Sequence, residues 1–212
     1  MLIIGDDCDA LSQLFTKEQG SHHFDRVYQI IHVDKQSSLQ AISSIYHNIV
    51  TLSLDLSNPT ALNALIQYIE KIQHHIHLCV FTPSFSNKTE SLEGVIRQQH
   101  LQWEKTGLST VLLSQSMIQH MLHISNGSLI FLAAEGAEGK HDDLLSQSLF
   151  AGIRALSQSL AREFQPKGIH ITYSKLSKWD NADNQLLQSV KDLCLHIHKQ
   201  PKSTWSQELN TA

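Results

Sequence analysis

The sequence has 212 residues, of which 41% are hydrophobic, and this length suits one domain with a sizeable core. The 16 Lys and Arg residues are outnumbered by 20 Asp and Glu residues, so the chain lacks the basic surplus of a nucleic-acid-binding protein. The longest apolar run, Leu129–Ala134, is too short to cross a bilayer, and the N-terminal residues lack a signal-peptide pattern. We therefore expect a cytoplasmic protein that binds neither nucleic acid nor membranes.

In the first third of the chain, short apolar runs bounded by Gly, Asp or turn residues indicate buried strands, and stretches with helical spacing separate them. Asn58 is the expected N-cap of one helix, because Pro59 follows it at the first helical position. The predicted elements are strand Met1–Ile4, strand Val27–Val33, helix Leu39–Tyr46, strand Ile49–Leu54 and helix Pro59–Gln73.

The rest of the chain continues this alternation. The predicted elements are strand Ile76–Phe81, helix Ser109–Ile124, strand Leu129–Ala134, helix Leu144–Phe164, strand Ile169–Tyr173 and a helix at about Ala182–His198. The tail from about residue 200 to residue 212 is expected to be weakly structured or to add an edge strand at Ser203–Leu209. Strands that alternate with helices predict βαβ units and a parallel sheet, so the fold class is α/β.

The segment Ala155–Tyr173 reads ALSQSLAREFQPKGIHITY and resembles the long helix and following strand of the short-chain dehydrogenase/reductase family. Other segments resemble parts of that family in the same order, from first to fifth strand: Ile3–Gly5, Val33–Asp34, Ser53–Ser57, Leu78–Ser84 and Gly127–Ala134. The resemblance implies a three-layer, Rossmann-like, doubly wound sheet with strand order 3-2-1-4-5-6, in a single domain that spans residues 1–212.

The resemblance also implies a catalytic Tyr whose hydroxyl is acidified by a Lys four residues later, on the same helix face. Ser146 and Phe150 occupy these positions, and none of the four tyrosines has a Lys at the fourth following residue. The family's catalytic Ser falls on Ala134, or on Glu135 with a shift of one residue. The family's Asn positions in strand four and in the following helix fall on Phe81, Thr82 and about Thr106.

The family's cofactor loop, TGxxxGxG, is also changed. Gly5 is retained, but Asp9 and Leu11 replace the second and third glycines, and Asp6 and Asp7 add further carboxylates. At about 4 Å each like-charge approach to a phosphate costs roughly a few kcal/mol, whereas micromolar binding supplies about 8 kcal/mol. We therefore expect NAD(H) to bind weakly at most.

Two residues that the resemblance assigns to the adenosine end of the cofactor are present. Asp34 stands where a carboxylate accepts from the ribose, which favours NAD over NADP, and Asp55 matches the Asp on the adenine side. Asp is also frequent in turns and caps at strand ends, so both residues have a purely structural interpretation. The resemblance implies a loop after the sixth strand that covers the substrate, and in this sequence that loop is shortened or missing. Trp179 lies in this segment and either packs there or stacks on a ligand.

Histidines form two short clusters, His74–His77 and His196–His198, but each lacks a convincing third ligand. The cysteines, Cys8, Cys79 and Cys194, are too widely spaced to form a metal motif. We therefore predict no metal site. His141 precedes a helix and either marks its first turn or serves with Glu135 as a substitute acid and base.

In the family that the chain resembles, the helices equivalent to 109–124 and 144–164 pack against their copies in a second subunit. The resemblance therefore implies a homo-oligomer through these helices, or pairing with an active homologue. The preferred hypothesis is a non-catalytic binding or partner protein. The alternatives are an NAD(P)-dependent oxidoreductase with a rearranged site and an adenosine-nucleotide sensor.

Overall fold

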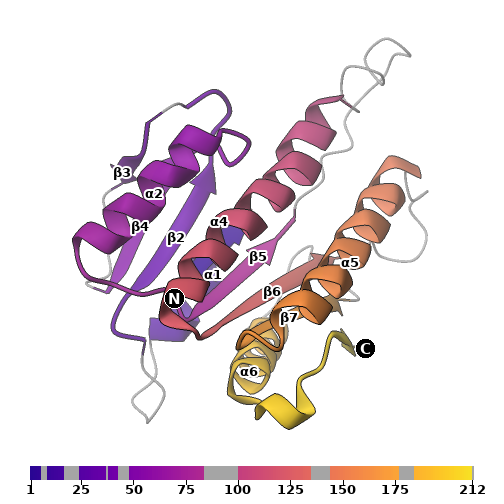
Figure 1. The fold of residues 1–212 in the computed structure, drawn as a ribbon. Coiled ribbons are helices and arrows are strands. Elements are labelled where there is room, and N and C mark those ends of the chain that lie inside the picture. The colour runs from indigo at the N-terminus through magenta and orange to yellow at the C-terminus, as the bar shows by residue number, and fades with distance from the viewer. Residues whose placement is uncertain are drawn as a thin grey trace.

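The computed structural model describes residues 1–5, 9–16, 24–36, 38–42, 48–83, 100–134, 144–176 and 184–211. Its centre is an eight-stranded sheet with the order β3-β4-β2-β1-β5-β6-β7-β8, in which β3 is antiparallel to β4 and the other pairs are parallel (Figure 1). The strands are β1 Leu2–Gly5, β2 Val27–His32, β3 Gln40–Ile42, β4 Ile49–Leu54, β5 Leu78–Thr82, β6 Gly127–Ala134, β7 Ile169–Leu176 and β8 Glu208–Thr211.

The six predicted strands and their order are confirmed, with ends displaced by a few residues. Strand β1 lies at the centre, where Ile3 aligns with Gln29 of β2 on one side and with Val80 of β5 on the other. The three-layer, doubly wound α/β class is therefore confirmed, and the chain reverses its winding direction between β1 and β5.

One predicted helix is wrong within the described residues. Gln40–Ile42, which fall inside the helix expected at Leu39–Tyr46, form the antiparallel edge strand β3, and residues 43–47 lie outside the described ranges. A helix of eight residues is marginal in water, whereas pairing with β4 satisfies the backbone hydrogen bonds of both strands. At the other edge, the strand expected at Ser203–Leu209 is only partly right: β8 spans Glu208–Thr211, and Lys202–Thr204 form a 3-10 helix instead.

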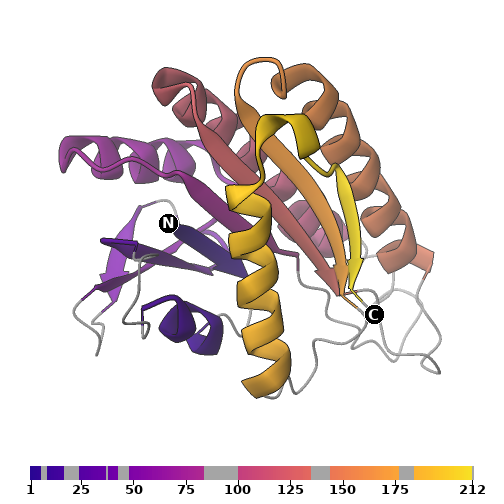
Figure 2. The ribbon, with the colours of Figure 1, turned by 90° about the horizontal axis from the view of Figure 1, so that it is seen from below.

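Helices cover both faces of the sheet (Figures 1 and 2). One face carries α2, α4 and α5, whose apolar side chains join a core with Ile4, Ile30 and Phe131, and the other carries α1 and α6 over Ile3 and Val80. The helices are α1 Asp9–Thr16, α2 Pro59–Lys71, η1 Trp103–Leu108, α4 Ser109–Ile124, α5 Leu144–Phe164, α6 Asn184–Lys199 and η2 Lys202–Thr204.

The predicted start of α2 is confirmed, because Asn58 Oδ1 accepts a hydrogen bond of 2.9 Å from the backbone N–H of Thr60 and Pro59 is the first helical residue. Directly before α4 the chain forms η1, which is a π-helix, and apolar spacing does not reveal it. In the described ranges, no helix has both the length and the hydropathy that crossing a membrane requires.

Candidate functional site

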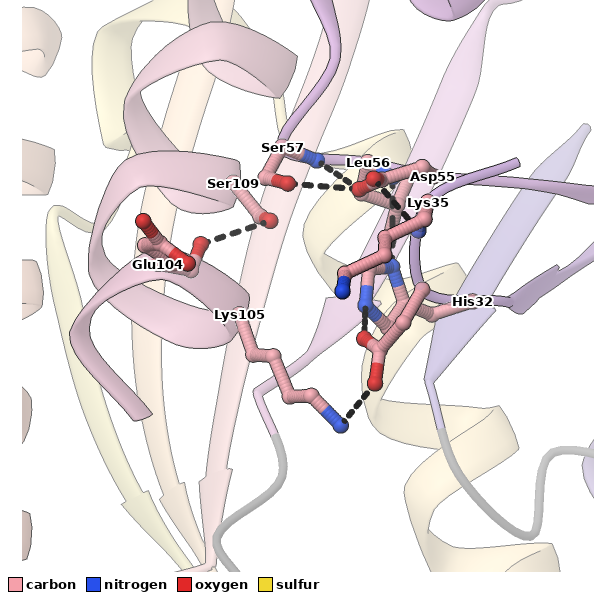
Figure 3. Close-up of polar contacts among 9 residues, drawn as sticks. His32, Lys35, Asp55, Leu56, Ser57, Glu104, Lys105 and Ser109 are labelled. Carbon is pink, nitrogen blue, oxygen red and sulfur yellow. Dashed lines mark hydrogen bonds and ion pairs between the residues drawn. The ribbon is translucent and has the colours of Figure 1, made fainter. Parts of the chain in front are cut away.

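The candidate site lies at the carboxyl ends of β2, β1 and β5, because ligands of open parallel sheets bind where the winding direction reverses. Three described segments meet there: the loop that follows β2, the turn that follows β4, and η1 (Figure 3). Polar side chains from all three form one connected set of contacts.

Asp55 is buried, and its carboxylate holds two of these segments together. Its Oδ1 accepts hydrogen bonds from the backbone N–H of Ser57 at 2.9 Å and from the Ser57 hydroxyl at 2.6 Å. Its Oδ2 accepts from the backbone N–H of Lys35 at 2.9 Å, and Lys35 adopts the left-handed conformation with φ of +62°. The carboxylate thus ties the turn after β4 to the loop after β2 (Figure 3).

Asp34 lies at the mouth of the site, with about half of its side chain exposed, and both of its carboxylate oxygens are engaged. Its Oδ1 is 2.9 Å from His32 Nε2, and its Oδ2 is 2.7 Å from the Lys105 ammonium. His32 Nδ1 accepts from the backbone N–H of Leu56 at 3.1 Å, so its Nε2 carries the proton that is donated to Asp34. Burial acts to raise the pKa of Asp34, but Lys105 and His32 outweigh it and lower that pKa below its usual value.

The π-helix η1 positions Lys105, and its own sequence supports the wide turn. The Ser109 hydroxyl donates to the carbonyl oxygen of Glu104 at 3.2 Å, and the Thr110 hydroxyl donates to that of Thr106. A Cβ atom on Gly107 would lie 2.8 Å from the Trp103 ring, so glycine is needed for that ring to lie across the helix. Single π-turns of this kind are uncommon and often occur at functional sites.

The cofactor-loop positions are only partly within the described ranges, since residues 6–8 lie outside them. Gly5 has a φ of +152°, a conformation that favours glycine. Asp9 is the first residue of α1, and its carboxylate accepts a hydrogen bond from the Gln29 side chain. Leu11 is fully buried in the core on the α1 side of the sheet.

At the predicted catalytic positions, α5 carries a half-buried Ser146 and, one turn later, Phe150. Phe150 is 7% exposed and belongs to the core with Phe131 and Ile153. The three positions expected to carry Asn are also inside the protein, because Phe81, Thr82 and Thr106 are all buried.

Several residues that sequence reasoning singled out cannot be placed. Glu135, His141 and Trp179 lie outside the described residues, as do Asp6 and Asp7, and Ala134 is placed only as the last residue of β6. Sequence reasoning in turn missed His32 and Lys105. His32 carries a weak signal, as a polar residue two positions before Asp34 at a strand end, whereas Lys105 carries none because only the fold brings it to β2.

The histidine cluster at the opposite, amino edge of the sheet does not converge on a common point. The ring centroid of His75 lies 6.3 Å from that of His77 and 6.2 Å from that of His120. His120 Nε2 already accepts from the backbone N–H of Ile76 at 3.1 Å. Across the described residues, no group of three or more His, Cys, Asp or Glu side chains is arranged to hold a metal ion.

Solved structures show which known proteins share this architecture. A short-chain dehydrogenase from Rhodopseudomonas palustris is similar over 100% of this chain and 97% of its own, with 20% identity and a TM-score of 0.72. An oxidoreductase of the short-chain dehydrogenase/reductase family from Brucella ovis, in complex with a partially ordered NAD, is similar over 100% and 98%, with 14% identity and a TM-score of 0.72. The chain has the short-chain dehydrogenase fold. No protein-family model and no curated protein sequence matches it.

The similar structure from Brucella ovis holds a partially ordered NAD, so a nicotinamide dinucleotide is the group to test against this site, and two of the described residues are unfavourable to it. A dinucleotide needs a free helix N-terminus for its pyrophosphate, but the Asp9 carboxylate stands in the first turn of α1. It also needs an acceptor for a ribose hydroxyl, and at Asp34 a ribose would have to compete with His32 and Lys105 for the carboxylate.

Proposed function

We propose that this protein is a non-catalytic member of the short-chain dehydrogenase fold that acts as a binding or partner protein. The observation that carries the proposal is Phe150, a buried core residue where a catalytic site of this kind needs a Lys. A phenyl ring cannot lower the pKa of a nearby hydroxyl, and Ser146 is too weak an acid to protonate a carbonyl oxygen near neutral pH. The engaged oxygens of Asp34 support the same proposal.

The partner that we propose is a second copy of the chain, which binds across α4 and α5. These helices lie side by side on one face of the sheet (Figure 1), and α4 contains no Asp, Glu, Lys or Arg. Val111 and Leu122 of α4 are nevertheless exposed, as is Leu108 immediately before it. A two-fold interface places the same surface opposite itself, so contact through α4, which has no Asp, Glu, Lys or Arg, avoids like-charge repulsion on self-association.

The catalytic part of the proposal is tested by an activity assay with NADH and NADPH against a panel of aldehydes and ketones. We expect no cofactor oxidation above that of the heat-denatured protein. Turnover that rises in proportion to protein concentration would overturn the proposal. If that turnover also fell in Glu135→Gln or His141→Gln, the result would favour an oxidoreductase with a rearranged site.

A further inference from the structure

The end of the chain forms a segment that lies along one edge of the sheet. We call residues 200–211 the C-terminal strap: it follows α6, passes through η2 and ends as β8, which pairs with β7 (Figure 2). No side chain of residues 200–210 is fully buried, and Leu209 is partly buried against the core. Polar contacts therefore do much of the work of holding the strap, as in segments that open locally.

These contacts meet at His170 of β7, which is buried. Its Nδ1 atom lies 3.0 Å from the carbonyl oxygen of Ile197 in α6, and its Nε2 atom lies 3.0 Å from that of Ser206 in the strap. The Trp205 ring stacks on the imidazole, with the centroids 4.7 Å apart and the planes 3° from parallel. The Thr172 hydroxyl donates to the same Ser206 oxygen at 2.7 Å. One imidazole thus joins β7, α6 and the strap.

The strap is also braced internally, so it can dock or leave as a unit. The Trp205 Nε1–H donates to the Gln200 carbonyl oxygen at 2.8 Å. The Gln200 side chain bonds the Ser206 backbone N–H at 3.1 Å and the Ser206 hydroxyl at 3.2 Å. Farther along, the Glu208 carboxylate receives Arg154 of α5 at 2.8 and 2.9 Å. Because the Arg154 side chain is half exposed, this ion pair adds only modestly to docking.

Two influences on the protonation of His170 oppose each other. Burial disfavours the charged imidazolium, whereas the carbonyl oxygens of Ser206 and Ile197 favour a proton on each ring nitrogen. Burial is the larger influence, so the pKa of His170 lies below its usual value. The docked strap therefore favours the neutral ring.

In the described part of the chain, the groups that face His170 supply no negative charge to offset this burial. Helix α6 presents His198, and the two histidines disfavour each other's protonated form. In η2, the Lys202 ammonium lies 5.9 Å from the centroid of the indole that stacks on His170. Strand β6 presents the neutral Ser128, which aligns with His170, and Glu208 of β8 is bonded to α5 instead.

We propose that His170 is an acid-sensitive clip for the C-terminal strap: the strap is docked while the His170 ring is neutral and is released when the ring takes up a second proton. A ring that the strap no longer covers binds that proton at about pH 6.5, more readily than the docked ring, so docking weakens as the pH falls below this value. Release opens the edge of β7, and an open strand edge can pair with another chain. The inference goes beyond the proposed function, since it concerns neither catalysis nor the α4 and α5 surface.

Amide hydrogen exchange tests the clip. The N–H of Tyr173 in β7 donates to the Gln207 carbonyl oxygen at 3.0 Å, so its protection reports docking of the strap. The N–H of Tyr28 donates to the Met1 oxygen at the centre of the sheet, so its protection reports global unfolding. We expect Tyr173 to be less protected than Tyr28 and, after correction for intrinsic exchange, to lose up to about tenfold protection per pH unit below about pH 6.5, the limit for one proton.

Three variants separate the clip from general loosening. His170→Gln keeps a donor and an acceptor but cannot take up a proton, so Tyr173 protection should no longer depend on pH. Thr172→Val removes a strap contact that does not titrate, so it should lower Tyr173 protection at every pH and keep the wild-type pH dependence. His196→Gln, at an exposed position of α6, is the matched control and should behave as the wild type does.

An NMR titration of the His170 ring in the wild type keeps the test decisive if His170→Gln fails to dock the strap. The ring should protonate with a midpoint below about pH 6.5, together with the loss of Tyr173 protection. A midpoint above this value, Tyr173 protection that is independent of pH or equal to that of Tyr28, or a docked His170→Gln variant with the wild-type pH dependence would each overturn the clip. The non-catalytic proposal would stand in all these cases, because it fails only on turnover.

Discussion

At the scale of single residues, two aspartates at corresponding strand ends have different surroundings. Asp55 is buried and accepts hydrogen bonds from two backbone N–H groups and a hydroxyl. Asp34 is half exposed and is paired with Lys105 and His32. Asp55 therefore organises the backbone around the site, whereas Asp34 is the group that a ligand could reach.

Asp55→Ala should lower the free energy of unfolding by about 2–3 kcal/mol, because hydrogen bonds to a charged, buried acceptor are lost and two backbone donors are left unpaired. Urea unfolding measures this. Asp192→Ala on α6 is the control: Asp192 is exposed and accepts from the Gln188 side chain, so the loss should be about 0.5 kcal/mol or less. Equal losses in the two variants would contradict the role given to Asp55.

The positions of Asp34 and Asp55 could be predicted from sequence, because each follows an apolar run and the local pattern of residues indicates where a strand ends. Their partners could not. Lys105 is remote from Asp34 in the chain, and the contact exists because the sheet order brings η1 beside the loop after β2. The tertiary fold determines which contacts a carboxylate oxygen makes, so the sequence pattern does not show whether that oxygen can accept from a ligand.

At the scale of elements, apolar patterning predicted what is long and buried and failed where an element is short or irregular. The helices α2 and α5 follow their 3.6-residue periodicity. Strand β3 has exposed side chains at Gln40, Ala41 and Ile42, so no buried face marks it, and only pairing with β4 forms it. The π-helix η1 differs from an α-helix in its hydrogen bonding and not in a recognisable residue pattern.

The end of α6 supplies a prediction about pH. Burial is the largest cause, and together with the nearby charges of His77, the N-terminus, His170 and Lys199 it lowers the pKa of His198 to about 4. The Nδ1 atom of His198 lies 2.9 Å from the Ser128 hydroxyl. In the unfolded chain a His has a pKa of about 6.5, so the unfolded state binds more protons than the folded state between about pH 6.5 and about pH 4. Stability should therefore fall as the pH is lowered through this window.

His198→Gln should make the decrease in Tm between about pH 7 and about pH 5 shallower, since one partly buried His no longer has to stay neutral. Other histidines with lowered pKa values, such as His120 and His170, keep the slope from vanishing. His196→Gln, an exposed position on the same helix, should retain the wild-type slope. Thermal melts across this pH range decide the point, and identical slopes in His198→Gln and the wild type would count against it.

At the scale of the whole molecule, the face of α4 and α5 is the proposed meeting surface of two copies. Val111→Asp places a charge among the exposed apolar residues of α4, and an unpaired charge that is buried in an interface is costly. We expect light scattering to show the mass of a dimer for the wild type and of a single chain for this variant.

Ile72→Asp is the matched control, because Ile72 is also an exposed apolar residue, 39% against 46% for Val111, but follows α2. It should stay dimeric. A wild type that is monomeric at all concentrations, or an Ile72→Asp variant that dissociates as readily as Val111→Asp, would contradict the proposed interface. If the chain instead formed a mixed complex with an active homologue, the homologue and not a second copy would be the partner.

The most direct test of the central proposal, that this chain lacks a working cofactor site, is a calorimetric titration of the wild-type protein with NADH, with a catalytically active short-chain dehydrogenase as the positive control. The carboxylate of Asp9 at the start of α1 and the engagement of Asp34 by Lys105 predict no saturable binding up to about 1 mM NADH. Saturable binding with a dissociation constant of about 1 μM, accompanied by carbonyl reduction, would contradict the account.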